Sequence, residues 1–279
     1  MASRRYRILA LDVDGTLLDP EGTLRPRTAL AVLNAARAGI RPVLCTGRRF
    51  RRARPIAERL GLATPIVCNS GAIVKDPSDR RTLWRADLAP EFATRLLALF
   101  AEHGQDAVAF TDREDDEPDF LVSRFPTHRA PFDDYVGQNR EHAEIAAAPG
   151  PDPCFHVCAI GTRAEMLQFQ QVLHDRLGER VRTFVQRSPR YLGTMCEVLR
   201  HDASKWTAVL HLAELWGVAP EEICAVGDDV NDVPMIRHAG LGVAMGHASA
   251  DVRAAADLVT GDHDQDGVAM LVEDVLLAG

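Results

Sequence analysis

Short apolar runs alternate with amphipathic stretches from residue 8 to residue 68. The first run is Ile8–Leu11, and Val43–Cys45 and Pro65–Cys68 follow it. Such runs are typical of strands that are buried on both faces of a parallel sheet. The stretches between them carry helix signals, with Pro26 near a helix start and Gly39 just after a helix end. This alternation predicts a parallel sheet covered by helices on both faces.

The pattern changes near residue 84 and returns near residue 193. Between these points, helical stretches alternate with spaced strand-like runs, and the polar loops contain proline, which indicates a separate α+β unit. We therefore expect a Rossmann-like α/β core of 1–83 and 193–279, interrupted by an inserted α+β domain of 84–192. The returning core is expected to contain a helix over Ser204–Leu215 and strands at Ile223–Val226, Leu241–Met245 and Leu258–Thr260.

Composition narrows the class of protein. The 279 residues are 46% hydrophobic and 26% charged, which is typical of a soluble globular protein. The net charge of -8 argues against a general nucleic-acid binder, because neutralising phosphates needs an excess of Lys and Arg. The apolar runs are too short for a membrane span, and the first is too short for a signal peptide.

The six cysteines include no CxxC pair. Cys45, Cys68 and Cys224 lie in apolar runs, where a free cysteine packs as a small hydrophobe. Cys154 and Cys158 flank a histidine, but the alternation of a strand explains this spacing better than a metal site does. The cysteine pattern therefore predicts a reducing, cytoplasmic setting.

Two carboxylates follow the first apolar run, in the segment DVDGTLL. Asp12 and Asp14 are two residues apart, and the period of a strand points both side chains the same way. Two like charges held together at a strand end repel each other and weaken the fold. We therefore expect a cation between them.

Similar polar residues follow other expected strands. Because ligands bind at the carboxyl ends of the strands in an open α/β sheet, these groups should meet at one edge. Several carboxylates at one edge favour a hard divalent cation with oxygen ligands, for which Mg²⁺ is the default. The groups are Asp12 with Asp14, Thr46 with Gly47, Asn69, and Asp228 with Asn231 and Asp232.

This set of residue types suits phosphoryl transfer. An aspartate beside a cation can attack phosphorus and form an aspartyl-phosphate. Thr46 and Gly47 offer a hydroxyl and an unhindered N–H to a phosphoryl group, and Lys205 can neutralise negative charge. Asp14 can then act as general acid and base. Taken singly, each group also fits a turn, a loop start, a surface lysine or a helix cap, so the hypothesis depends on their conjunction.

The segments DVDGTLL, TGR, the Lys205 helix and GDDVND resemble the four motifs of the haloacid dehalogenase-like phosphohydrolases. The chain is most similar to the Cof-type sugar-phosphatase branch, whose large α/β cap is inserted at the position of residues 84–192 and selects the substrate. Trp206, His247 and His263 depart from that pattern, which usually has glycine, asparagine and asparagine there. Asn69 and Asp264 fit it.

The resemblance implies a role for each site residue. Asp12 is the expected nucleophile and magnesium ligand, and Asp14 the acid/base that also ligates through its backbone carbonyl. Lys205 is expected to steady negative charge, and Asn231 to contact phosphate. Asp228 is an expected direct magnesium ligand, and Asp232 one acting through water. Thr46, Gly47 and Asn69 are expected at the phosphoryl group, and Arg48, next to them, near the anionic substrate.

The leading hypothesis is a Mg²⁺-dependent phosphatase that hydrolyses a small phosphorylated metabolite through an aspartyl-phosphate. A sugar phosphate is the first candidate substrate, and pyridoxal phosphate or a flavin nucleotide the next. The alternatives are a phosphomutase of sugar phosphates and a phospho-receiver module, which would need no large insertion. We expect no nucleic-acid or membrane partner, and a monomer or homodimer.

Overall fold

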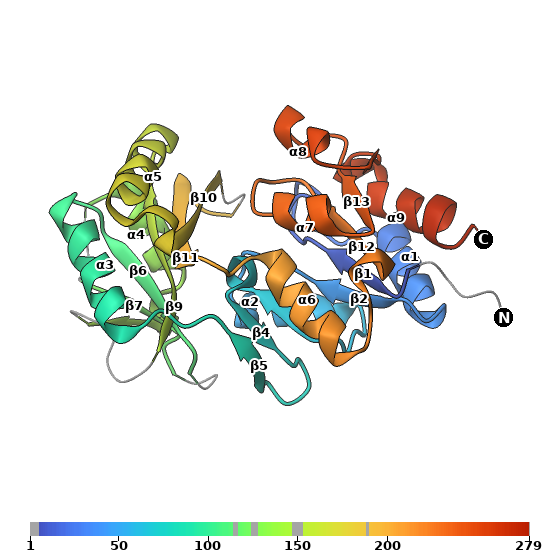
Figure 1. Ribbon diagram of the computed structural model, residues 1–279, viewed down its shortest axis with the longest axis horizontal. Coiled ribbons are helices and arrows are strands. Elements are labelled where there is room, and N and C mark those ends of the chain that lie inside the picture. The colour runs from blue at the N-terminus through green and yellow to red at the C-terminus, as the bar shows by residue number, and fades with distance from the viewer. Residues whose placement is uncertain (1–5, 114–116, 124–127, 147–152, 188–189, 279) are drawn as a thin grey trace. The chain divides into compact units, whose positions relative to one another are not determined.

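The computed structural model describes residues 6–113, 117–123, 128–146, 153–187 and 190–278. The chain forms two compact units (Figure 1). The first consists of Met1–Trp84 and Ser204–Gly279, and the second of Arg85–Ala203.

The first unit is built on a five-stranded sheet whose paired strands all run parallel, in the order β14-β13-β12-β1-β2. Strand β1 (Ile8–Leu11) is buried throughout and lies between β12 and β2, with Leu11 level with Val226 and Leu44. Figure 1 shows β1 and β12, from distant parts of the chain, side by side. The predicted parallel α/β core is confirmed. The other strands are β2 (Arg41–Leu44), β12 (Ile223–Gly227), β13 (Leu241–Ala244) and β14 (Leu258–Val259).

Helices follow the strands as the apolar pattern predicts. Helix α6 (Lys205–Leu215) buries Val209 and Leu212 in one cluster with Ile8 and Ala10 of β1. Helices α1 and α9 pack against each other. The bounds are α1 (Pro26–Arg37), α2 (Phe50–Arg59), α7 (Val233–His238), α8 (Ala250–Ala254) and α9 (Gly267–Leu271), and a π-helical turn (Val272–Leu276) ends the chain's last helical segment.

The third predicted strand is placed differently from our expectation. Strand β3 (Ile66–Cys68) pairs antiparallel with β4 (Ile73–Lys75), in a small sheet that also contains β5 (Thr82–Arg85). A single parallel bridge, from Val67 to Cys45, links β3 to the end of β2. The sequence pattern missed this turn-back of the chain, because it follows Asn69 and Ser70, whose positive φ angles of 50° and 55° leave no hydrophobic signal.

Helix α2 contains a proline in its interior. The helix runs through Pro55 and ends at Arg59. Its buried residues, Phe50, Ala53, Ile56 and Ala57, form a stripe on both sides of the proline, so packing outweighs the loss of one backbone hydrogen bond.

The second unit has a six-stranded sheet in the order β10-β11-β9-β6-β7-β8, antiparallel except for β7 and β8. Strand β11 (Thr194–Arg200) pairs with β9 and β10, so the chain re-enters the first unit at Ser204 and not at residue 193 as expected. The remaining strands are β6 (Ala107–Thr111), β7 (Phe120–Val122), β8 (Ala143–Ile145), β9 (Cys154–Gly161) and β10 (Val181–Arg187), and the helices are α3 (Pro90–Glu102), α4 (Ala130–Gln138) and α5 (Arg163–Leu177).

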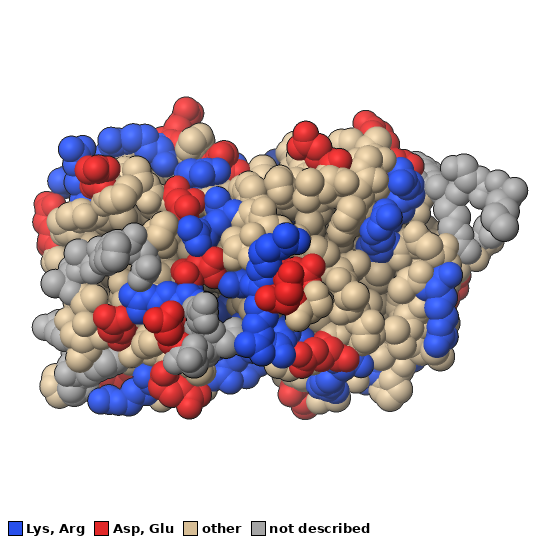
Figure 2. Space-filling view, turned by 90° about the horizontal axis from the view of Figure 1, so that it is seen from below, with Lys and Arg blue, Asp and Glu red and all other residues tan. Residues whose placement is uncertain are grey.

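Cysteines and surface charge agree with the composition. All six cysteines are free and buried. Among the described residues, no helix is long and apolar enough to cross a bilayer. On the described part of the face drawn in Figure 2, acidic side chains are interspersed among the basic ones, as expected of a chain with 40 acidic and 32 basic residues.

The start of α6 is held by a capping box and by a close backbone approach. Ser204 caps the helix through a hydrogen bond from the Thr207 N–H to its hydroxyl (3.1 Å). Gly71 has a φ of 95°, and a Cβ there would overlap the backbone of Ser204 and Lys205. Only glycine therefore lets the turn after β3 lie against the helix start.

We expect Gly71→Ala to lower the free energy of unfolding by about 3 kcal/mol, since it combines a strained φ with a backbone overlap. Gly39→Ala is the matched control, because Gly39 has a φ of 87° and open space around it. The control should cost only about 1 kcal/mol. Urea unfolding measures both values, and equal losses would show that the close approach to α6 is unimportant.

Candidate active site

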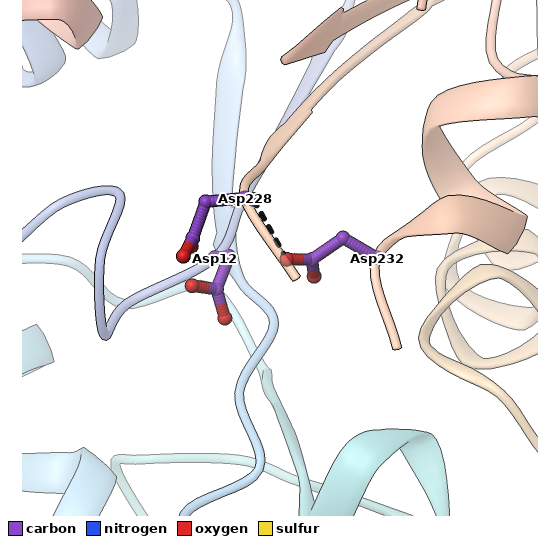
Figure 3. Close-up of side chains that lie close together, drawn as sticks. All are labelled: Asp12, Asp228 and Asp232. Carbon is purple, nitrogen blue, oxygen red and sulfur yellow. Dashed lines mark hydrogen bonds between the residues drawn. The ribbon is translucent and has the colours of Figure 1, made fainter. Parts of the chain in front are cut away.

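Three aspartates meet at the carboxyl ends of two neighbouring strands. Asp12 follows β1, Asp228 follows β12, and Asp232 immediately precedes α7. Each offers a carboxylate oxygen within 4.8 Å of the others, and Figure 3 shows the three side chains converging. In an open α/β sheet, a crevice forms where connections leave adjacent strands in opposite directions, as they do from β1 and β12.

Lys205 bridges two of these acids. Its Nζ donates to Oδ1 of Asp12 and to Oδ1 of Asp232, at 2.6 Å each. The lysine side chain is 1% exposed. Burial alone would lower the pKa of Lys205, but the two carboxylates outweigh it and hold the pKa above its ordinary value. Lys205 therefore stays protonated and keeps its positive charge next to Asp12 and Asp232.

Both carboxylate oxygens of Asp232 accept hydrogen bonds from the protein. While Oδ1 accepts from Lys205, Oδ2 accepts the backbone N–H groups of Asp228 (3.0 Å, dashed in Figure 3) and Asp229 (3.1 Å). Gly227 permits this arrangement, because a Cβ there would overlap the Asp232 carboxylate. These hydrogen bonds suit a residue that positions the loop and reaches a cation through water.

Asp228 is oriented by the loop after β1. The Thr16 hydroxyl donates to its Oδ1 (2.9 Å). At Gly15, where φ is 86°, a Cβ would overlap the Asp228 carboxylate. Neither Thr16 nor Gly15 was predicted to have a role, although both stand in the DVDGTLL motif.

The acids carry more negative charge than Lys205 can balance. Burial raises the pKa of Asp12 well above its usual range, and repulsion from Asp232 adds to this. Burial and the Asp232 charge also raise the pKa of Asp228 to about 7. A buried cluster of this kind is stabilised by a cation, and its oxygen donors suit Mg²⁺. Asp12 and Asp228 can ligate the ion directly, since Asp232 has both oxygens engaged.

The other predicted phosphoryl-binding residues gather beside these acids by backbone hydrogen bonds. The Ser70 N–H donates to the Thr46 carbonyl, and the Asn69 N–H donates to the carbonyl of Arg48, at 3.0 Å each. Gly47 lies between Thr46 and Arg48 in the same loop. The turn after β3 and the loop after β2 are thereby joined.

Asn231 reaches this turn from the loop that carries Asp228. Its Nδ2 donates to the Ser70 hydroxyl at 3.1 Å, in a buried hydrogen bond. Ser70 was missed by sequence reasoning. This hydrogen bond joins the loop that carries the acids to the loops that are predicted to bind the phosphoryl group.

Asp14 lies apart from the three-acid cluster and pairs with Arg48. The Arg48 Nε donates to Oδ2 of Asp14 (2.6 Å), and Nη2 donates to Oδ1 (2.5 Å). Sequence spacing placed both residues near the substrate but gave no indication that they bind each other.

The three departures from the family pattern have different surroundings. Trp206 is part of α6 and is buried in the core cluster that this helix forms with β1. The rings of His247 and His263 lie 4.0 Å apart, and Nε2 of His247 is 3.7 Å from Oδ2 of Asp228. Burial, with a smaller effect of His247, lowers the pKa of His263. The histidines are therefore neighbours of the site, whereas the tryptophan is part of the core.

A parallel α/β core with a buried lysine and carboxylates at adjacent strand ends is typical of an α/β enzyme, and its acidic cluster could hold a cation. The chain belongs to the haloacid dehalogenase-like hydrolase family, whose model matches residues 9–272. The resemblance drawn from the motifs, the Cof-type branch included, and the prediction of an enzyme are confirmed.

Relatives match the chain over nearly its whole length. It is 30% identical to the pyridoxal phosphate phosphatase YbhA of Escherichia coli, over 97% of this chain and 99% of that one. It is 25% identical to the 5-amino-6-(5-phospho-D-ribitylamino)uracil phosphatase YwtE of Bacillus subtilis, over 97% and 98%. The fold is similar to that of a haloacid dehalogenase-like hydrolase of B. subtilis, with a TM-score of 0.79, 24% identity and 97% and 100% coverage.

We expect Asp228→Asn to stabilise the metal-free protein more at pH 8 than at pH 5. A folded-state pKa near 7, above the ordinary 3.8, means that folding binds protons, so this group's contribution to stability is lost as pH rises toward 7. Asparagine carries no such penalty. In chelator, the difference between variant and wild type should grow by on the order of 2 kcal/mol between the two pH values.

Urea unfolding measures this difference, with the exposed Asp274→Asn as the control, which should show no such growth. An Asp228→Asn difference that is independent of pH would contradict the crowding of charge at the site.

Proposed function

We propose that the protein is a Mg²⁺-dependent phosphatase that hydrolyses a small phosphorylated metabolite through an aspartyl-phosphate on Asp12. The observation that supports this best is the surroundings of Asp12. The buried Lys205 donates a hydrogen bond to its carboxylate, and a carboxylate oxygen of Asp228 lies within 4.8 Å, close enough for both acids to ligate one cation. Bound Mg²⁺ would supply positive charge to the carboxylates and to the phosphoryl oxygens. The family and the names of the two curated relatives agree with a phosphoric monoester hydrolase.

In the first step, the Asp12 carboxylate attacks phosphorus. Lys205 draws charge from Oδ1, so Oδ2 is the better nucleophile, and Oδ1 keeps a second lone pair for the cation. The Asp12 oxygen–phosphorus bond forms as the bond from phosphorus to the leaving oxygen breaks, and protonated Asp14 gives its proton to that oxygen. Lys205 and the N–H groups of the loop after β2 stabilise the charge of the transition state.

In the second step, water cleaves the aspartyl-phosphate. Asp14, now ionised, removes a proton from the water as the water oxygen bonds to phosphorus. The bond between phosphorus and Asp12 breaks, and the Asp12 carboxylate, inorganic phosphate and protonated Asp14 are restored. Each residue therefore returns to its starting state.

Two substrate classes have specific support. A sugar phosphate follows from the Cof-type resemblance of the motifs. Pyridoxal phosphate is the second candidate, because the E. coli relative named for that activity is 30% identical over 97% of this chain. A phosphomutase remains the alternative reaction, in which the phosphoryl group returns to a sugar and no phosphate is released. Cytoplasmic location and a monomeric or homodimeric state remain predictions.

The test is release of inorganic phosphate from a panel containing hexose phosphates, pyridoxal phosphate and flavin mononucleotide. We expect turnover with Mg²⁺, loss of turnover with a chelator, and recovery when Mg²⁺ is restored. Asp12→Asn should lower the rate by about a thousandfold or more, because the nucleophile is lost.

Asp274→Asn, on the exposed surface, is the matched control and should keep the wild-type rate. Isomerised sugar phosphate without free phosphate would favour the phosphomutase. A rate for Asp12→Asn above about a hundredth of wild type would rule out the covalent step.

A further inference from the structure

The ion pair between Arg48 and Asp14 uses both oxygens of the carboxylate. Two guanidinium nitrogens donate to two oxygens, at 2.6 and 2.5 Å, with the side chains 9% and 22% exposed. Such two-point pairs hold both partners in one orientation. An Asp14 held in this way has both oxygens directed at Arg48, whereas the proposed mechanism requires the same carboxylate to exchange a proton with the leaving group and with water.

Arg48 is anchored where a phosphoryl group is expected. Its N–H donates to the Thr46 hydroxyl (3.1 Å), and its carbonyl accepts from Asn69 (3.0 Å). These bonds fix the backbone of Arg48 and leave its guanidinium to a partner. The planar fork of arginine fits two oxygens of a carboxylate and two oxygens of a phosphoryl group equally well.

A phosphoryl group has the advantage in charge. At neutral pH, a phosphate monoester carries about -1.5 to -2, whereas a carboxylate carries one negative charge. With the same fork geometry, the more highly charged group is the stronger partner for a guanidinium that is largely shielded from water.

We propose that Arg48 exchanges partners during catalysis. Without substrate it holds the Asp14 carboxylate. When substrate binds, its two N–H groups move to the phosphoryl oxygens, and the freed Asp14 takes up a proton from water that it then gives to the leaving oxygen. Asp14 releases a proton to water when it pairs with Arg48 again. Arg48 is then a substrate-binding residue that also positions the acid/base. This inference rests on the proposed function, and it explains why the acid/base is engaged until a phosphoryl group arrives.

The exchange makes Asp14 and phosphate competitors for Arg48. Removing the Asp14 charge should therefore tighten the binding of inorganic phosphate, and only while Arg48 is present. The experiment measures the phosphate dissociation constant by calorimetry, with Mg²⁺ present, for wild type, Asp14→Asn, Arg48→Gln and the double variant.

We expect Asp14→Asn to bind phosphate about fivefold more tightly than wild type, and Arg48→Gln to bind it more weakly. In the Arg48→Gln background, Asp14→Asn should give no gain. Simple relief of charge repulsion predicts instead the same gain in both backgrounds. Arg48→Lys, which keeps the charge without the fork, is the second variant if Arg48→Gln does not fold, and it should also reduce the gain.

Unchanged or weaker binding by Asp14→Asn, an equal gain in both backgrounds, or no phosphate binding by any of the proteins would overturn the exchange. Phosphate release by the wild-type protein is measured on the same preparations. Absence of release would count against the proposed function, whereas release with unchanged phosphate affinities would count against the exchange alone.

Discussion

A buried lysine surrounded by carboxylates is the constraint on which the rest of this structure depends. Lys205 offsets part of the charge of Asp12 and Asp232, but Asp228 adds a third acid that it does not contact. Leaving such charges uncompensated away from water is costly. The raised pKa values of Asp12 and Asp228 express that cost, and a divalent cation would relieve it.

The fold supplies this arrangement through close approaches of backbone to backbone and of backbone to carboxylate. Gly15 lets the first loop lie against Asp228, and Gly227 leaves room for Asp232. Gly71 brings the turn after β3 against the start of α6, where Lys205 begins the helix. The strands determine where the loops begin, and these glycines allow the loops to approach the carboxylates and the start of α6 closely.

Much of the core fold and of the acidic cluster was predictable, because buried strands and the polar residues that follow them form a clear pattern in the sequence. Asp12, Asp228 and Lys205 were expected together and do lie together. The antiparallel pairing of β3 with β4 was not predicted, because strand partners are chosen by contacts that a local pattern of residues does not encode. The bonds from Thr16 to Asp228 and from Arg48 to Asp14 likewise depend on side-chain geometry that spacing does not encode.

Acids distant in the chain are proposed to share one divalent ion, and a crystal structure of the protein with Mg²⁺ would show whether they do. We expect one ion about 2.1 Å from carboxylate oxygens of Asp12 and Asp228, with Lys205 still hydrogen-bonded to Asp12. An empty cluster at saturating Mg²⁺, or an ion held elsewhere with the three acids turned apart, would contradict it.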